Sequence, residues 1–490
     1  MSGLTSALSS ALSGLLVTST QSNVASRNVT RASDPDYNRE QAVLTTNLDG
    51  SVRVTGTQRA ASKQLMDALL QATSDSTAQS SILNAYNSLS ATVGDVQNDG
   101  SVAWGIDQLQ QALQSAEADP SNTTLATQAV STASGLASIL NNASSSVETV
   151  REQADAGIAT SVNTVNNLLA QFQTLDSSIA SGALTGDQKA SAEDQRDALL
   201  KQISAEIGIR TTQRSDGSMA IYTDGGVTLY DRTARKVTFT ASPTLSASST
   251  GGAVYVDGVA ITGTSSPMPS ATGRIAALAK VRDDVAPTYQ NQLDEIARAL
   301  ITTFSEKDQG TPATQPDATG LFSYSGSPTV PASGTLVPGL ASSIKINAAF
   351  DVSRGGNAFL LRDGGANGST YTYNATGAVG YQDRLASLIS ALGQPQSFSS
   401  TTKLSTTNTL AGLATDSAGW VEGGRSTATT ASTAASATAS RTQDALLSAT
   451  GVSLDTEMAN LLSIEKSYQA SAKVLTTVNQ MLGDLMNAVN

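Results

Sequence analysis

The hydrophobic positions at the N-terminal end of this chain follow a helical spacing. Residues 1–26 carry no charged side chain, and the apolar residues Leu4, Leu8, Ala11 and Leu15 are separated by four, three and four positions. Such steps place side chains on one face of a helix. The pattern therefore predicts an amphipathic helix at the N-terminus.

The last forty residues show a stronger form of the same pattern. Their apolar side chains occupy the a and d positions of one heptad repeat, which only Ser471 interrupts. Because each terminal helix has one apolar face that needs a partner, we expect the two helices to pack on each other or on copies of themselves. This favours an assembling structural protein. The heptad positions are Leu461, Ile464, Tyr468, Leu475, Val478, Leu482, Leu485 and Val489.

Helical patterns also fill much of the chain between the two ends. One apolar face runs over residues 136–172 and indicates a rod-like helix in a bundle or coiled coil. Residues 424–449 predict a helix that leads into the C-terminal heptads. Pro287 predicts a kink or restart, because proline has no amide hydrogen. Further helices are predicted over 57–93, 187–206 and 271–307.

From Gly208 to about residue 263 the pattern changes to short β-prone runs separated by turns. Asp-Gly steps begin at 216, 224 and 257, between runs such as 219–222 and 227–230. Asp-Gly between β-prone runs is the strongest short-range hairpin signal. We therefore predict a small antiparallel β domain inserted into a helical scaffold.

Together these elements predict a mainly α, elongated, multidomain protein with a β insert. Strands are also expected at Ser343–Ile346 and Ala358–Arg362, within a segment rich in Gly, Pro, Ser and Thr. The predicted domains are a terminal helical coiled-coil domain (1–56 plus 450–490), a helical rod-like domain (57–207 plus 271–449, with a mixed segment at 309–400) and the β insert (208–270).

Composition narrows the chemistry that this architecture supports. The chain has 490 residues, a net charge of −12, no cysteine and no histidine. The missing side chains exclude disulfides, thiolate catalysis, histidine general bases and the usual zinc sites. No basic stripe is present to neutralise phosphates, so nucleic acid is not an expected partner. We expect no cofactor and no metal.

The N-terminus lacks the features of a cleavable signal peptide. Its first cation is Arg27, and Ser, Gly and Thr interrupt its apolar residues. No run approaches the ~20 apolar residues of a membrane helix. We expect no membrane insertion, and export without cleavage if the protein is exported.

Two other classes of function stay open on the residues alone. A surface adhesin would present the β insert on a helical stalk. A secreted carbohydrate-active enzyme would need a pair of carboxylates. The candidate carboxylates sit on predicted helices beside Arg196, Arg282 and Arg298, which is typical of solvated helix faces. They are Asp194, Asp197, Asp283, Asp284, Asp294 and Glu295.

Several short segments carry information beyond their spacing. The terminal ones are 11–15 (ALSGL), 21–26 (QSNVAS), 455–462 (DTEMANLL) and 468–475 (YQASAKVL), and the internal ones are 195–200 (QRDALL), 273–278 (GRIAAL) and 292–297 (QLDEIA). These segments resemble the flagellar rod, hook and junction proteins, and within them the family of the first hook-associated protein (FlgK). The terminal segments are shared by several axial proteins, and Asp36 replaces the family's glycine in the element Asp36–Glu40. Internal segments narrow the resemblance to the first hook-associated protein, with hook protein and flagellin as the alternatives.

The resemblance implies a non-catalytic structural subunit that forms a ring at the hook–filament junction. Implied partners are further copies of the chain, the hook protein, the neighbouring hook-associated protein and filament, and an export chaperone on the C-terminal helix. The implied location is the external flagellum, reached by flagellar type III export.

The resemblance and the heptads together also give a set of expected assembly residues. Isolated amphipathic helices are marginal in water, so we expect the chain ends to be mobile in the monomer and to order on assembly. Leu475→Asp is then expected to leave a soluble monomer that does not assemble. The expected interface residues are Leu4, Leu8, Leu15, Tyr37, Arg39, Leu461, Ile464, Tyr468, Leu475, Val478, Leu482 and Leu485.

Overall fold

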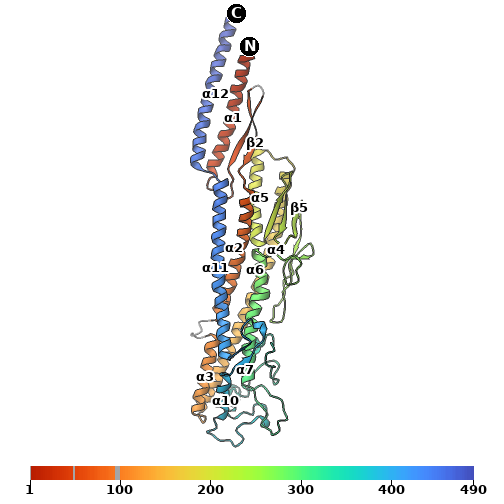
Figure 1. Ribbon diagram of the computed structural model, residues 1–490, viewed down its shortest axis with the longest axis vertical. Coiled ribbons are helices and arrows are strands. Elements are labelled where there is room, and N and C mark those ends of the chain that lie inside the picture. The colour runs from red at the N-terminus through yellow and green to blue at the C-terminus, as the bar shows by residue number, and fades with distance from the viewer. Residues whose placement is uncertain (1, 48–49, 94–99, 490) are drawn as a thin grey trace.

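The protein is an elongated, mainly helical molecule in a computed structural model that describes residues 2–47, 50–93 and 100–489 (Figure 1). Helices α1 (Ser2–Thr30) and α12 (Leu454–Val489) run antiparallel at one end, where both termini lie. This confirms the predicted mainly α, elongated fold. The rod below contains α2 (Lys63–Val93), α3 (Val102–Ala118), α4 (Thr123–Ala180), α5 (Gly186–Glu206), α6 (Gly273–Lys280), α7 (Ala286–Thr303) and α11 (Leu410–Thr450).

Helix α4 forms the backbone of the rod. It has 58 residues, which at 1.5 Å per residue is a length of roughly 87 Å. Its buried side chains recur every three or four positions from Ala126 to Ile179, so the predicted apolar face extends beyond 136–172. One hydrophobic cluster joins its first half to α3, α7, α11 and the distal loops, and a second joins its other half to α5 and the β insert.

The chain around Pro287 stays helical through a local change of winding. Helix α6 passes into a π-helical turn at Val281–Val285, and α7 follows with Pro287 in its first turn. Proline is tolerated there because its missing amide hydrogen would have had no partner across the new turn. The predicted restart therefore takes the form of a π-helical turn, which carries the buried residue Arg282.

The β insert consists of two small antiparallel sheets on the side of the rod (Figure 1). One has the order β3-β4-β5-β6. The other has the order β7-β8-β9, and its last turn has positive φ at Asp257 (47°) and Gly258 (83°), as a two-residue hairpin requires. The strands are β3 (Ile209–Gln213), β4 (Met219–Thr223), β5 (Thr228–Asp231), β6 (Thr233–Ala234), β7 (Val237–Thr238), β8 (Tyr255–Val256) and β9 (Val259–Ala260).

The terminal unit, predicted as a helical coiled-coil domain, also contains two strands. Strands β1 (Glu40–Thr46) and β2 (Val52–Arg59) form an antiparallel hairpin beside α1. The predicted boundary at residue 56 falls inside β2, and α2 begins at Lys63. The alternation of Val52 and Val54 with polar residues is the strand signal that the helical interpretation overlooked.

The far end of the rod is made of loops and short elements. The strand expected at Ala358–Arg362 is wrong, because this stretch enters a helical turn, where Asn357 Oδ1 accepts a hydrogen bond from the Phe359 amide. The short elements are β10 (Phe322–Ser323), α8 (Leu340–Ser343), β11 (Lys345–Ile346), α9 (Leu360–Asp363), α10 (Asp383–Leu392), β12 (Gln396–Ser397) and β13 (Thr407–Asn408).

Two buried arginines fasten the β insert to the rod. The Arg151 guanidinium donates to the carbonyls of Ser246 and Ser249, each at 2.6 Å. Arg282 pairs with Asp155 at 2.6 Å and donates to the Gly252 carbonyl at 2.8 Å. The arginines of the rod thereby donate hydrogen bonds to carbonyl groups of an insert loop that has few backbone–backbone hydrogen bonds of its own.

Arg282→Ala is expected to lower the free energy of unfolding by about 3–5 kcal/mol, because it leaves Asp155 buried and unpaired. The matched control is Arg235→Ala, which breaks the exposed pair with Asp257 and should cost about 0–1 kcal/mol. Urea denaturation followed by circular dichroism measures both, and equal losses would contradict the structure.

Asp294 ties α7 to the distal loops. Its carboxylate accepts hydrogen bonds from the amides of Gly339 and Ala341 at 2.8 Å and from the Gln290 side chain at 2.9 Å. Burial raises the pKa of Asp294 to about 6, although these hydrogen bonds oppose the shift.

The raised pKa of Asp294 has a consequence for stability. Between about pH 4 and 6 the folded chain holds a proton that the unfolded chain releases, so this contribution is complete below pH 4 and is lost as pH rises through 6. The unfolding free energy of the wild type minus that of Asp294→Asn should therefore fall by up to about 3 kcal/mol between pH 4 and 7. Urea titrations at both pH values test this, and a constant difference would exclude it.

Candidate functional site: the terminal helix pair

The predicted heptad stripe of α12 packs on α1 of the same chain. Val478 is only 3% exposed. Its stripe neighbours Leu461, Ile464, Leu475 and Leu482 are half-buried, as are Leu4, Leu8 and Leu15 of α1. The structure thus pairs these stripes with the other end of the same chain, which is one of the two partners expected. The side chain of Val489 lies outside the described residues.

The one interruption of the heptads has a packing reason. A methyl group added to Gly14 of α1 would lie 3.0 Å from the Ser471 hydroxyl and 3.7 Å from its Cβ. The two helices are thus close together at this level, and only small side chains fit between them. Ser471 belongs to the same seam as the leucines.

A second set of apolar side chains on the pair stays exposed. Val474 and Met481 precede stripe residues, whereas Leu462 follows one, so this set flanks the seam on both sides. Tyr468 and Leu485, which were expected in the stripe, are 50% and 42% exposed. We call the set the outer apolar residues; it comprises Leu12, Leu16, Leu454, Met458, Leu462, Tyr468, Val474, Met481, Leu485 and Met486.

A groove between the two helices adds to this surface. It has a volume of ≈ 530 Å³ and is lined by the small side chains Thr18, Ser19 and Ser22 of α1 and by Met458 and Tyr468 of α12, among others. The small residues leave space that a side chain from outside the chain can fill.

Tyr37 and the backbone of Arg39 make contacts within the chain. Tyr37 is 3% exposed, and its hydroxyl donates to the Asn28 side chain at 2.7 Å. Asn28 also bonds to the backbone of Glu40 in both directions. The Arg39 amide donates to the Thr450 carbonyl at 2.8 Å. These residues hold the bend between α1 and β1 against the end of α11.

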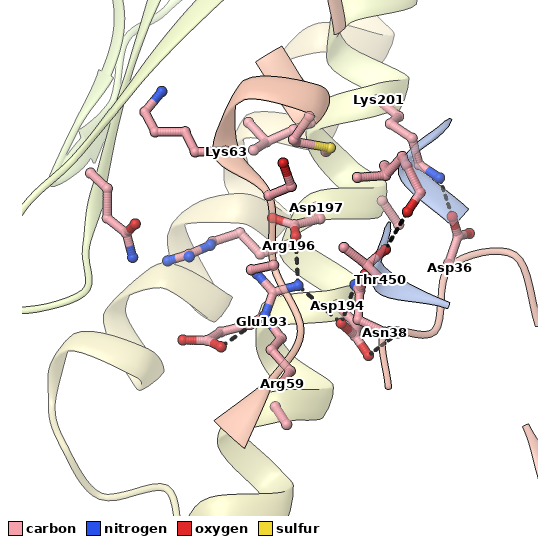
Figure 2. Close-up of a pocket in the computed structure, with 18 of the residues that line it drawn as sticks. Asp36, Asn38, Arg59, Lys63, Glu193, Asp194, Arg196, Asp197, Lys201 and Thr450 are labelled. Carbon is pink, nitrogen blue, oxygen red and sulfur yellow. Dashed lines mark hydrogen bonds and ion pairs between the residues drawn. The ribbon is translucent and has the colours of Figure 1, made fainter. Parts of the chain in front are cut away.

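An ionic cluster attaches the terminal unit to the rod (Figure 2). Arg59, at the end of β2, pairs with Glu193 at 2.9 Å, Asp194 at 3.1 Å and Asp197 at 2.7 Å, all on α5. Asn38 donates to Asp194 at 2.7 Å. These side chains line a cavity of ≈ 340 Å³. Burial raises the pKa of Asp194, and the bonds to Asn38 and Arg59 oppose that rise.

The carboxylates considered for catalysis lie in separate ion pairs or hydrogen-bond networks. Asp194 and Asp197 belong to the Arg59 cluster, whereas Asp283 pairs with Arg282 and Asp284 with Lys403. Glu295 pairs with Arg298, and both are fully buried. The interpretation as solvated helix faces holds for Asp283 and Asp284, which are exposed. It is wrong for the buried side chains, which are Asp194, Asp294, Glu295, Arg196, Arg282 and Arg298.

Sequence reasoning missed the attachment cluster around Arg59. The acidic residues Asp187, Asp194 and Asp197 recur at helical spacings and signal a charged face of α5. Nothing in the sequence links that face to Arg59, which is more than 130 positions away. Among the described residues, no helix is long and apolar enough to span a membrane, and no acidic group has the arrangement of a metal site.

Comparisons with known proteins match both parts of this architecture. Residues 86–315 match the model of the flagellar hook-associated protein FlgK helical domain, and residues 443–488 match that of the flagellar basal body rod FlgEFG protein C-terminal. The first region covers α3 to α7 with the β insert, and the second covers most of α12. The first model covers slightly less than half of the chain, and the second covers its C-terminal end.

A relative and a solved structure extend the match. Flagellar hook-associated protein 1 of Bacillus subtilis (strain 168) is 24% identical over 378 residues, which are 72% of this chain and 69% of that protein. The flagellar hook junction protein FlgK from Burkholderia pseudomallei shares the fold with a TM-score of 0.58 and 14% identity, over 77% of this chain and 99% of that one. These sequence matches identify the chain as a relative of flagellar hook-associated protein 1, FlgK.

Proposed function

We propose that this protein is a structural subunit of the hook–filament junction and that it assembles through its outer apolar residues. Its family consists of structural proteins of the external flagellum. The observation that carries the mechanism is that α12 keeps large apolar side chains exposed although α1 covers most of its heptad stripe. Exposed apolar patches of this kind mark interaction surfaces.

The energetics favour assembly with further copies of the chain. Burying one large apolar side chain stabilises by roughly 1.5–3 kcal/mol, so several outer apolar residues offset the cost of ordering the subunits. These residues flank the seam on both sides, so each subunit offers a surface to a neighbour on either side. Contacts between unlike surfaces close into a ring when the rotation allows it.

The expected interface residues divide into three groups under this proposal. Tyr468 and Leu485 make contacts between subunits. Tyr37 and Arg39 act indirectly by bracing the bend below α1. The remaining residues hold the helix pair together and so create the surface; they are Leu4, Leu8, Leu15, Leu461, Ile464, Leu475, Val478 and Leu482.

We further propose that the role is structural without catalysis and that the hook protein and the adjacent hook-associated protein or filament are the axial partners. Export without cleavage by the flagellar type III route fits the cysteine-free chain. The same outer apolar residues support the proposal that an export chaperone binds α12. A chaperone would shield these exposed side chains from water until the subunit assembles.

Deletion of the gene in the source organism tests the junction role. We expect hooks that carry no filament, and we expect flagellin to be released into the culture medium, because the filament would have no junction on which to assemble. Normal filaments and normal motility would overturn the proposal and favour the adhesin, whose binding would survive removal of both terminal helices.

The double substitution Val474→Asp with Met481→Asp tests the assembly surface. It places two charges among the outer apolar residues without entering the seam, so it should abolish incorporation into flagella when it replaces the wild-type chain. Immunoblots of sheared flagella measure incorporation, and normal incorporation would refute the surface.

Val478→Asp is the comparison for the double variant, because it places a charge inside the α1–α12 seam and not on the outer surface. Helix pairing is monitored by Gly14→Cys with Ser471→Cys, whose Cβ separation of 3.7 Å suits a disulfide. The chain has no other cysteine. We expect the cross-link to form in the outer-surface double variant and to be lost in Val478→Asp.

A further inference from the structure

A pocket of ≈ 540 Å³ lies at the end of the rod opposite the two chain termini (Figure 1). Its walls come from the end of α7, from α10, from β12 and from neighbouring loops. Pockets that bind small molecules have volumes of about 300–1,000 Å³. The pocket is therefore large enough for a ligand, and it shares no lining residue with the cavity beside Arg59.

The lining of this pocket is positive, although the chain as a whole has a net charge of −12. Among the described residues that line it, Lys307 and Arg384 are cations and none is acidic. Much of the remaining lining consists of hydroxyl and amide side chains, including the exposed Ser333, Ser387 and Ser397. Hydroxyl groups both donate and accept hydrogen bonds. The lining thus suits a ligand that combines a negative charge with several hydroxyl groups.

Arg384 brings a buried charge with unused donors to the pocket. Its side chain is 4% exposed, and its Nη2 lies 3.6 Å from a carboxylate oxygen of Glu306, which is too long for a hydrogen bond. Its Nε and Nη1 are covered and have no hydrogen-bond partner among the described residues. Buried donors are nearly always paired, so Arg384 is an exception. In the low dielectric of the interior, its charge acts strongly on the pocket that it lines.

The groups around Arg384 hold it in place without neutralising it fully. Its guanidinium stacks on the Tyr373 ring at 4.1 Å. The carboxylate of Glu306 also accepts hydrogen bonds from two backbone amides of a neighbouring loop, at 3.2 and 3.1 Å. Asp363 pairs with Arg362 at 2.7 Å. Burial lowers the pKa of Arg384, and Glu306 opposes that shift.

Tyr373 connects the two cations of the pocket. Its ring lies against Arg384, and its hydroxyl accepts a hydrogen bond from the Lys307 amide at 2.9 Å. The phenolic hydrogen of Tyr373 can then be donated to a ligand. Lys307 is exposed, so its ammonium can follow a ligand that enters. The pocket thus combines a fixed buried cation with a flexible exposed one.

We propose that this pocket binds a sugar acid, that is, a sugar that carries a carboxylate. Lys307 and Arg384 attract the carboxylate, and the lining hydroxyls bind the hydroxyl groups of the sugar. The inference goes beyond the junction role, because the pocket lies at the far end of the rod and does not depend on the order or the assembly of the terminal helices. A free sugar acid and one unit of an acidic polysaccharide present the same chemistry.

Ligand-detected NMR titrations of the full chain test the pocket with galacturonate, galactose and inorganic phosphate. Galacturonate should bind at least about tenfold more tightly than galactose, which lacks the charge, because hydrogen bonds to charged groups are the stronger ones. Phosphate, which lacks the sugar ring, should bind more weakly than galacturonate. No binding of galacturonate, or equal binding of galactose or phosphate, would overturn the proposal.

Trigalacturonate distinguishes the two sources of the ligand once galacturonate binds. Tighter binding per sugar unit than galacturonate assigns the pocket to an acidic polysaccharide. Equal affinity per unit assigns it to a single sugar acid.

Lys307→Gln should weaken galacturonate binding by about threefold, as expected for an exposed charge pair. The matched control is Lys345→Gln, which removes an exposed lysine of β11 that does not line the pocket. Its affinity should equal that of the wild type. Equal affinities in the two lysine variants would overturn the location of the site.

Arg384→Gln should weaken galacturonate binding by at least about tenfold. If this variant does not fold by circular dichroism, Ser387→Trp replaces it, because Ser387 is an exposed residue of α10 whose enlargement fills the pocket. Unchanged binding in the folded variant would overturn the proposal. These measurements concern ligand binding alone, so they are separate from the gene deletion that tests the junction role.

Discussion

The continuous apolar face of α4 is the constraint on which the rest of the structure depends. A single helix of 58 residues with one buried face cannot satisfy that face by itself, because an isolated amphipathic helix is marginal in water. Its first half is covered by α3, α7, α11 and the distal loops, and its second half by α5 and the β insert. Segments far apart in sequence are thereby gathered along one axis, and the elongated shape follows.

Charged side chains attach both the β insert and the terminal unit to the rod, but the two sets differ in how far they are buried. The β insert is fastened through Arg151 and Arg282, which are almost fully buried and bind backbone carbonyls of the insert loop. The terminal unit is fastened through Arg59 and side-chain carboxylates that water partly reaches. Buried pairs are costly to break, whereas partly exposed pairs exchange with solvent and salt more readily. The insert is thus held firmly, while the terminal unit has the weaker attachment that an assembling end requires.

The terminal helices show why assembly needs more apolar surface than one helix pair uses. Helix α12 carries apolar residues beyond its heptad stripe, and α1 covers only part of the stripe, since Tyr468 and Leu485 stay exposed. A helix that is apolar on several faces is stable when several neighbours cover it. Among the described residues of one chain, α1 and the hairpin are the only other elements at this end, so the remaining surface is left for other subunits.

The spacing of apolar and polar residues predicted much of the secondary structure of this protein from the sequence alone. Helices and turns depend mainly on residues that are close in the sequence. Local patterns therefore predicted the terminal helices, the long apolar face of α4 and the turns of the β insert. Short local segments also carried the resemblance to the hook-associated family. The hairpin β1–β2 was missed because the helical interpretation of 1–56 masked its short alternation.

Tertiary structure alone decided which partner each face received. The heptads of α12 were compatible with a copy of the chain or with α1, and the close contact of Gly14 with Ser471 shows the second. The buried Tyr37 hydroxyl donates a hydrogen bond to Asn28. Arg59 pairs with Glu193 of α5, which is more than 130 positions away in the sequence. Such pairings depend on contacts between distant segments, and one-dimensional spacing carries no information on distance in space.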